Sequence, residues 1–381
     1  MTASDATVAP TLPELGYYAL SRHPVNPAEL VSEAQLADRV GFGAAFISER
    51  FNVKDAAAIS GGLVAASRRM GVATAATNHN TRHPIITASM GATLSTMSGG
   101  RFALGLGRGF ALQWQVLGLP DVTSAQLTDV ASVLRTLWRG EMILAHDGPL
   151  GKFDYLNIGV EVPPVPIMLV TMSPKTLRLA GRIADAVVLH TFFSDEATRT
   201  AVKTVRAAAE EAGRDPASVR IWGVVATVPD EFDEAERRRR LYGRLATYLQ
   251  GYPDVLMRAN GWRADDLEKI RASSAFTDAR GPIDATATDD ELIELAELIP
   301  GSWVADSAVG TPAECAATIA RQFDLGVDSV IMHGAAPSEL LPVLDAYRAV
   351  RPTLPELPVN PGMCASASTA AAHPVEAGEN R

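Results

Sequence analysis

Residues 27–51 read PAELVSEAQLADRVGFGAAFISERF, and this stretch contains one complete helix-to-strand unit. Apolar residues recur there at the spacing of a buried helix face, at Leu30, Ala34, Ala37 and Val40. Gly41 is a typical residue for ending a helix, and the apolar run Ala44–Ile47 that follows has the length of a buried strand. The charged residues Glu49 and Arg50 come directly after this strand.

The same unit recurs along the chain. The apolar runs that we expect to be strands are Glu14–Leu20, Ala44–Ile47, Gly71–Ala76, Arg101–Leu106, Val165–Val170, Ala184–His190, Val219–Val228 and Asp328–His333. Amphipathic helical segments separate these runs, and an alternating strand–helix series requires a parallel sheet. Eight strands in a chain of 381 residues fit a (β/α)8 TIM barrel better than a doubly wound sheet.

Three segments fall outside the bare barrel pattern. Residues 141–158 have a turn signal between two short apolar pieces, which predicts a hairpin. Residues 231–300 have a mostly helical pattern, and we expect a helical insertion between strands 7 and 8 that covers the barrel mouth. We therefore predict one barrel domain over residues 1–351, followed by a disordered or loosely packed tail over residues 352–381, which is rich in Ala, Ser and Pro.

Composition narrows the classes of protein. The 47% hydrophobic content allows a sizeable core, and no apolar run is long enough for a membrane-spanning helix. The net charge of −10 argues against a nucleic-acid binder. The first residues do not resemble a secretory signal, and the chain has only two cysteines, Cys315 and Cys364, so we expect a cytoplasmic protein without a disulfide framework.

The carboxyl ends of barrel strands are where active sites form. The polar residues expected at those ends are His23, Glu49, Arg50, Thr77, Asn78, His79, Arg108, His190 and His333. The run from Thr77 to His83 contains two histidines but no metal-binding spacing, so we expect no metal site. The Glu49-Arg50 pair is open to two interpretations, a functional pair or a salt bridge at the rim.

A helix start at Ser173-Pro174-Lys175 predicts an anion pocket. Serine at the N-cap and proline at the first position leave early amide groups available, and Lys175 adds positive charge. An ordinary capped helix is the alternative. The glycines of Gly105-Leu106-Gly107-Arg108-Gly109 do not form a dinucleotide-binding motif, because Phe110 occupies the place of its last glycine.

Several motifs, in order, resemble the luciferase-like superfamily of flavin- and deazaflavin-dependent oxidoreductases, in particular its actinobacterial branch that uses coenzyme F420. The resemblance covers about residues 14–350. The motifs are residues 41–51 (GFGAAFISERF), 77–84 (TNHNTRHP), 94–109 (LSTMSGGRFALGLGRG), 180–189 (AGRIADAVVL) and 309–315 (VGTPAEC).

The resemblance implies a barrel with the deazaflavin across its mouth and a non-proline cis peptide at Ala75-Ala76. It implies that Glu49 touches the cofactor and that Arg50, where the family usually has histidine, faces the substrate; we predict both as catalytic residues. The predicted cofactor contacts are Glu49, Ala75, Ala76, Thr77, Asn78, Gly107, Arg108, Gly109, Met172, Ser173 and Lys175. The predicted substrate contacts are Arg50, His79, Phe110 and His190.

Departures from the family pattern narrow the range of reactions that fit this sequence. Arg50 replaces the usual histidine, and Phe110 replaces a glutamate that acts as an acid in the sugar-phosphate dehydrogenases, which argues against glucose-6-phosphate oxidation. The leading hypothesis is an F420-dependent oxidoreductase that transfers hydride to or from a small organic substrate. The alternatives are an FMN-dependent luciferase-like monooxygenase and a non-catalytic cofactor-binding protein. The resemblance also allows for a homodimer.

Overall fold

A closed ring of eight parallel strands lies at the centre of the computed structural model, which describes residues 8–365. Each strand pairs with the next, β8 pairs with β9, and β11 pairs with β1, so the ring has no free edge. The ring strands are β1 (Leu12–Tyr18), β2 (Phe42–Ile47), β3 (Gly71–Thr74), β4 (Phe102–Leu106), β7 (Ile167–Val170), β8 (Ala186–Val188), β9 (Arg220–Pro229) and β11 (Ser329–His333). The predicted (β/α)8 barrel is therefore confirmed.

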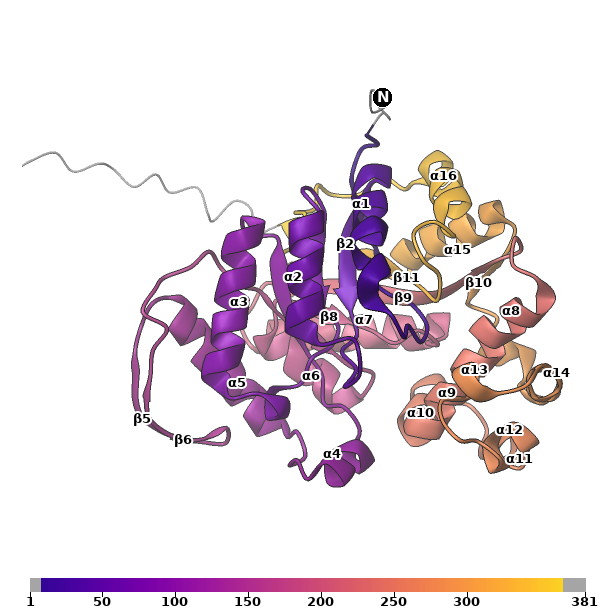
Figure 1. Ribbon diagram of the computed structural model, residues 1–381, viewed down its shortest axis with the longest axis horizontal. Helices are drawn as coiled ribbons and strands as arrows, with labels where there is room; N and C mark the ends of the chain where they lie inside the picture. Colours follow the sequence, from indigo (N-terminus) through magenta and orange to yellow (C-terminus); the bar gives the residue numbers. More distant parts are fainter. Residues whose placement is uncertain (1–7, 366–381) are drawn as a thin grey trace, which may run out of the picture.

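Helices surround the ring, and α1, α2 and α3 lie side by side on one side of it (Figure 1). The outer helices are α1 (Leu30–Val40), α2 (Ala56–Ala66), α3 (Pro84–Ser98), α5 (Ser124–Trp138), α6 (Pro174–Ile183), α7 (Asp195–Glu211), α15 (Pro312–Asp324) and α16 (Leu341–Val350). Gly41 ends α1 with a left-handed φ of +91°, as its position predicted. The sequence analysis missed α5 and α16, although Thr123 and Gln126 form a capping box at the start of α5.

The two faces of the ring bury different side chains. Ala45 and Ile47 of β2 join the large core between the ring and the helices, whereas Ala44 and Phe46 join a smaller cluster inside the ring. Phe46 packs against Trp222 of β9 there, with ring centroids 4.8 Å apart. The inner cluster is otherwise built largely from alanine and aliphatic residues, so two large aromatic rings fill a narrow interior.

The amino-terminal end of the barrel is covered by the segment 358–364. Arg220, at the start of β9, is completely buried and donates to the carbonyl oxygens of Pro358, Asn360 and Met363 at 2.9–3.1 Å. The same guanidinium donates to the carbonyl oxygen of Pro13 at 2.6 Å. Arg220 thus ties the two ends of the described chain to the barrel floor.

Asn360 adds a second set of contacts to this floor. Its side-chain amide donates to the carbonyl oxygens of Gly100 at 2.7 Å and Phe102 at 3.0 Å, and Trp222 Nε1 donates to Pro361 O at 2.7 Å. Residues 358–364 are therefore packed, in contrast to the loose tail expected from residue 352, because buried donors on the barrel satisfy the backbone of this proline-rich segment. The part of the expected tail from residue 366 to 381 lies outside the described residues.

We expect Asn360→Ala to lower the free energy of unfolding by about 2–3 kcal/mol, because the change leaves buried carbonyl groups of Gly100 and Phe102 without a donor. Chemical denaturation measures this loss. Glu356→Ala changes an exposed residue of the same tail and is the matched control. An Asn360→Ala protein as stable as this control would show that the floor contacts contribute little.

The predicted helical insertion follows β9 and returns to the barrel at β10 (Ala308–Gly310), and Figure 1 shows its helices as a separate group beside the barrel. Its helices are α8 (Glu234–Arg238), the π-helical turn η4 (Arg239–Gly243), α9 (Arg244–Gly251), α10 (Pro253–Asn260), α11 (Ala264–Arg271), α12 (Ser274–Thr277), α13 (Ile283–Thr286) and α14 (Asp289–Leu298). Arg240 joins it to Glu339 of the barrel through a 2.7 Å ion pair.

Two further elements complete the described chain. The predicted hairpin is present as β5 (Ile143–Gly148) and β6 (Gly151–Leu156), which project away from the barrel (Figure 1). The short helix α4 (Ala111–Leu117) follows β4. No helix within residues 8–365 combines the length and apolar character needed to cross a membrane.

Candidate active site

Glu49, at the end of β2, is a buried carboxylate whose oxygens are fully used by other residues. Its side chain is 2% exposed and forms an ion pair with Arg82. Thr77 Oγ1 donates to Oε2 at 2.6 Å, and the amide of Ala56 donates to Oε1 at 3.1 Å. Glu49 therefore pairs with Arg82 rather than with Arg50, so the predicted alternative of a Glu49–Arg50 salt bridge at the rim is wrong. Adjacent residues on a strand end point in different directions.

The ends of β3 and β4 bring five of the predicted cofactor residues together. The peptide between Ala75 and Ala76 is cis, as predicted. The amide of Gly107 donates to Thr77 O at 2.9 Å, and Asn78 Nδ2 donates to Gly107 O at 2.8 Å. A Cβ at Gly107 would lie 2.9 Å from that of Ala76, so only glycine permits this close approach.

Arg108 links this edge to the start of α6. Its Nε donates to Thr176 Oγ1 at 3.0 Å, and its other two nitrogens donate to Val122 O and Ser124 Oγ. Thr176 Oγ1 in turn accepts from Ser173 Oγ at 2.9 Å. The predicted residues Arg108 and Ser173 are thus neighbours in one hydrogen-bonded group, although every nitrogen of Arg108 already has a protein partner.

The remaining predicted cofactor residues lie around the same group. Gly109 has a left-handed φ of +62°, and a Cβ there would meet the ring of Trp114 at 2.1 Å. Ser173 caps α6 by accepting from Thr176 N at 3.3 Å. Met172 is half-buried and Lys175 is exposed beside this cap. Pro174 has no amide hydrogen, and the amides of Ser173 and Thr176 already donate to side chains, so the positive charge of Lys175 is what this helix start offers a phosphate.

Arg50 lies at the mouth of the barrel beneath the insertion. Its Nη1 donates to Arg22 O at 2.6 Å and lies 3.1 Å from Nδ1 of His23. Burial and repulsion from Arg244 lower the pKa of Arg50. The guanidinium is thus held by the loop after β1 and sits close to a second buried arginine.

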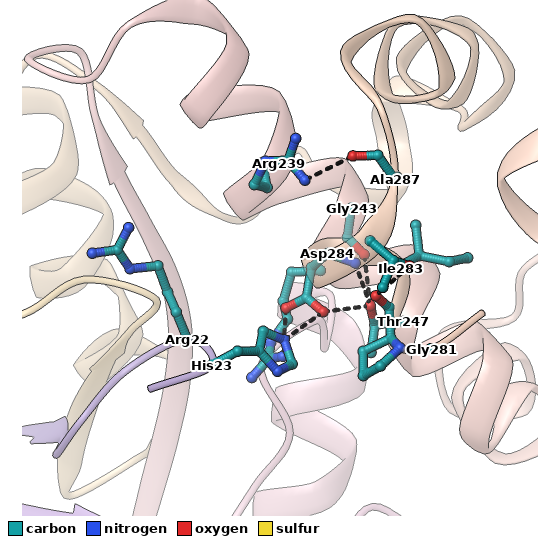
Figure 2. Close-up of polar contacts among 12 residues, drawn as sticks. Arg22, His23, Arg239, Gly243, Thr247, Gly281, Ile283, Asp284 and Ala287 are labelled. Atoms are coloured by element: carbon teal, nitrogen blue, oxygen red, sulfur yellow. Dashed lines mark hydrogen bonds and ion pairs between the residues drawn. The ribbon is translucent and has the colours of Figure 1, made fainter. Parts of the chain in front are cut away.

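Asp284 of α13 is the hub that joins the insertion to the barrel mouth, and Figure 2 shows His23 pointing toward it. Its Oδ1 lies 2.8 Å from His23 Nε2 and accepts from Thr247 Oγ1 at 2.8 Å, while Oδ2 accepts from Arg244 at 2.7 Å. Burial alone would raise the pKa of Asp284, but the hydrogen bond from His23 and the charge of Arg244 hold it well below its usual range. Asp284 is therefore ionised at neutral pH.

Tyr248 of α9 and Tyr252, which lies between α9 and α10, form an aromatic roof over the mouth. His190, at the end of β8, packs edge-on against Tyr248 with centroids 4.5 Å apart, and its Nε2 lies 3.3 Å from the hydroxyl of Tyr252. Phe110 stacks on Tyr252 at 5.4 Å. The insertion therefore lies at the carboxyl-end face, where it was predicted.

The histidines under this roof are neutral. Burial, with repulsion from Arg244, lowers the pKa of His190 to about 3, and the same two causes hold the pKa of His333 well below its usual value. Neither side chain can act as a protonated acid near pH 7. His190 is thus suited to contact or hydrogen-bond a substrate rather than to carry charge.

The predicted substrate residue His79 is placed differently. It is buried, burial lowers its pKa, and its Nε2 has no partner among the described residues. No hydrogen bond within residues 8–365 connects it to Arg50, Phe110 or His190. Phe110 and His190 thus contact Tyr252 of the roof, whereas His79 lies in the short 3-10 helix η2 (His79–Thr81) after β3.

Sequence reasoning missed the partners that fix the site. Arg82 stands in a motif that was recognised, but nothing in its spacing shows that it binds Glu49. Tyr248 and Tyr252 are four residues apart, which was the available signal for an aromatic surface, although Tyr252 lies just after α9 with a non-helical backbone. Arg244 and Asp284 were hidden in the insertion, whose order along the chain does not reveal which residues face the barrel.

Lys54 is a second missed residue near the mouth. It is 2% exposed, and its Nζ donates to Ala19 O at 2.9 Å and Leu20 O at 3.1 Å, where β1 ends. Burial, with repulsion from Arg50, lowers the pKa of Lys54 to about 7. Glu33 accepts from the amide of Leu20 at 3.0 Å, and burial raises its pKa to about 7. Two buried groups therefore titrate near neutrality behind Arg50.

Residues 10–329 match the luciferase-like monooxygenase family, so the chain belongs to this family. It is 28% identical over 316 residues to a 5,10-methylenetetrahydromethanopterin reductase from Methanolobus tindarius, which covers 81% of this chain and 91% of that protein. It is 30% identical over 212 residues to an F420-dependent glucose-6-phosphate dehydrogenase from Nakamurella multipartita, which covers 52% of this chain and 62% of that protein.

A solved structure agrees with the fold. The coenzyme F420 dependent tetrahydromethanopterin reductase from Methanopyrus kandleri superimposes with a TM-score of 0.72 at 20% identity, over 90% of this chain and 99% of that chain. The predicted family and the predicted oxidoreductase class are therefore confirmed.

We expect Arg82→Met to lower the free energy of unfolding by about 3–5 kcal/mol, because the change leaves the buried carboxylate of Glu49 without its counter-ion. Urea denaturation measures the loss. Arg263→Met removes an arginine from an exposed pair with Asp265 and should cost about 0–1 kcal/mol. Equal losses in the two variants would contradict a buried ion pair at Glu49.

Lys54 gives a prediction for pH. An unfolded lysine titrates near about 10.4, so between pH 7 and 10 the unfolded chain binds more protons at Lys54 than the native protein does. The contribution of Lys54 to the free energy of unfolding should therefore rise with pH in this window, by at most about 1.4 kcal/mol per pH unit. Denaturation at several pH values should show that Lys54→Met flattens this rise, whereas exposed Lys203→Met does not. Identical pH slopes in wild type and Lys54→Met would refute the assignment.

Proposed function

We propose that this protein is a coenzyme F420-dependent oxidoreductase that transfers hydride between the deazaflavin and a carbon of a small organic substrate. The observation that carries the proposal is the hydrogen-bonded link from Gly107 through Arg108 to the start of α6. This link places the closely packed backbone at the ends of β3 and β4 next to the start of α6, where Lys175 is positively charged. A cofactor with a planar ring and a phosphate needs both surfaces side by side.

The residues present fit such a cofactor. Ala75, Ala76 and Gly107 offer small, closely packed backbone against which a flat ring can lie. The first turn of α6 would hold the phosphate, with Lys175 supplying charge. Relatives with F420 in their names, a glucose-6-phosphate dehydrogenase and a tetrahydromethanopterin reductase, support this choice of cofactor.

The roles of the protein side chains follow from their contacts. The bound deazaflavin supplies the carbon that gives or receives hydride. Glu49 has no free lone pair, so it acts by fixing Thr77 and Arg82 rather than as a mobile base. Arg50 would stabilise negative charge on a substrate oxygen, and the aromatic roof would exclude water from the site.

The family itself includes monooxygenases, so an FMN-dependent monooxygenase is the second candidate. Titration of the purified protein with F420 and with FMN, followed by absorbance and fluorescence, separates the two. We expect saturable F420 binding and weak or undetectable FMN binding. Micromolar FMN binding without F420 binding would favour the monooxygenase, and binding without turnover on any substrate would favour the non-catalytic carrier.

We expect Lys175→Ala to weaken F420 binding while leaving the hydride-transfer step nearly unchanged, because a phosphate contact is the same in the ground and transition states. Loss of one exposed charge contact corresponds to about two- to fivefold in affinity. The effect should shrink as salt rises. Titration at two salt concentrations measures it, with Lys203→Ala on α7 as the charge-matched control. An unchanged affinity in Lys175→Ala would place the phosphate elsewhere.

We also propose that the enzyme acts in the cytoplasm as a homodimer. Exposed apolar side chains on α1 and α3, namely Val31, Ile86 and Met97, support a self-association surface. Light scattering on the purified protein tests the dimer, and a monomer at micromolar concentration would exclude it.

A further inference from the structure

Arg50 has an unused hydrogen-bonding edge at the barrel mouth. A guanidinium has five N–H groups, and Arg50 uses only the two on Nη1, toward Arg22 O and toward Nδ1 of His23. Within residues 8–365, no acceptor contacts its Nε or Nη2. These two nitrogens form the flat fork that binds a carboxylate through two parallel hydrogen bonds.

The neighbouring arginines Arg82 and Arg244, by contrast, are bound to carboxylates of the protein. Arg82 is paired with Glu49 and with Asp55, and Arg244 is paired with Asp284. The carboxylates of Glu49, Asp55 and Asp284 are thus each held by another arginine, although the charge of Asp284 also acts on Arg50. Arg50 is half-buried and has no ion pair of its own within residues 8–365, so a bound anion would give it a direct partner.

His23 and Asp284 hold the fork in place. Because a guanidinium only donates, His23 must accept at Nδ1 and carry its proton on Nε2, from which it donates to Asp284 Oδ1. Asp284 is itself fixed by Arg244 and by Thr247, and Figure 2 shows the contact with Thr247. The insertion thus orients Arg50 through His23, and residues far apart in the chain meet at one guanidinium.

The space next to Arg50 is large enough for a small anion. A cavity of about 370 Å³ adjoins it, lined by Glu49, Arg50, Phe51, Asn52, Asp55, Thr81 and Arg82. Burial and repulsion from Arg244 lower the pKa of Arg50, and an anion placed on the fork would offset that repulsion.

We propose that the substrate is a small organic acid whose carboxylate binds Nε and Nη2 of Arg50, and that His23 and Asp284 are the residues that position this arginine. This inference rests on the proposed function, because it names the substrate class of the same site. It concerns the residues of this chain and can be tested without turnover.

Calorimetric titration of the full-length protein with benzoate and with benzyl alcohol tests the fork, because the two probes share a ring and differ in charge. We expect wild type to bind benzoate at least about tenfold more tightly than benzyl alcohol. Arg50→Met should lower benzoate affinity by about ten- to a hundredfold and remove the preference. Arg50→Lys should restore only part of it, since lysine lacks the fork. The surface variant Arg263→Met should behave as wild type.

The positioning role has its own readout. His23→Ala should weaken benzoate binding by about three- to tenfold while leaving benzyl alcohol binding unchanged, because only the charged contact depends on the orientation of Arg50. His23→Asn keeps an acceptor near the position of Nδ1 and should recover most of the loss. A variant that merely disturbed the fold would weaken both probes equally, and that result would overturn the role of His23.

Titrations with and without F420 keep this inference separate from the proposed function. F420 binding with no preference for benzoate would overturn the organic-acid proposal and leave the cofactor assignment intact. A preference for benzoate without F420 binding would overturn the cofactor assignment and leave the organic-acid proposal intact. If F420 abolished benzoate binding, the cofactor rather than the substrate would occupy the fork, and the proposal would be wrong.

Discussion

A closed ring of parallel strands has no free edge, but it has two open ends, and the rest of this structure depends on how those ends are covered. Polar backbone groups at each end need partners, and the narrow interior needs to be shut off from water. At the carboxyl ends the helical insertion lies over the mouth. At the amino ends the segment 358–364 supplies carbonyl oxygens to buried Arg220. The mouth is thus covered by an inserted group of helices that is tied down through His23 and Asp284, whereas the floor is closed by a short segment bound to Arg220.

At the mouth, the pairing of charged side chains decides which of them remain free to bind a ligand. Two carboxylates, Glu49 and Asp284, are saturated by arginines and hydroxyl groups, and both therefore serve to fix other residues. Burial keeps His190 and His333 neutral. The guanidinium of Arg50 is left as the charged group with open donors. A site with this balance favours binding and orientation by the protein, and leaves the redox chemistry to a cofactor.

The sequence predicted the barrel because strand length and helical spacing are local properties, visible in Ala44–Ile47 and in the face of α1. It also predicted the rim residues, since the position after each strand fixes which end of the barrel they occupy. It could not predict that Glu49 pairs with Arg82 or that Asp284 reaches His23, because those contacts join elements 33 and 261 residues apart. The packing of residues 358–364 was missed for the same reason, since their composition shows no core, whereas their backbone oxygens meet donors supplied by the barrel.

The covering of the barrel floor has a consequence for biosynthesis. Arg220 receives acceptors from residues at least 138 positions later in the chain, and translation proceeds from the amino to the carboxyl terminus. All eight strands are therefore synthesised before the last partners of Arg220 exist. Until then the guanidinium of Arg220 lacks these acceptors. The newly synthesised barrel is therefore incomplete at its amino-terminal end, and chaperones and proteases can act on it in that state.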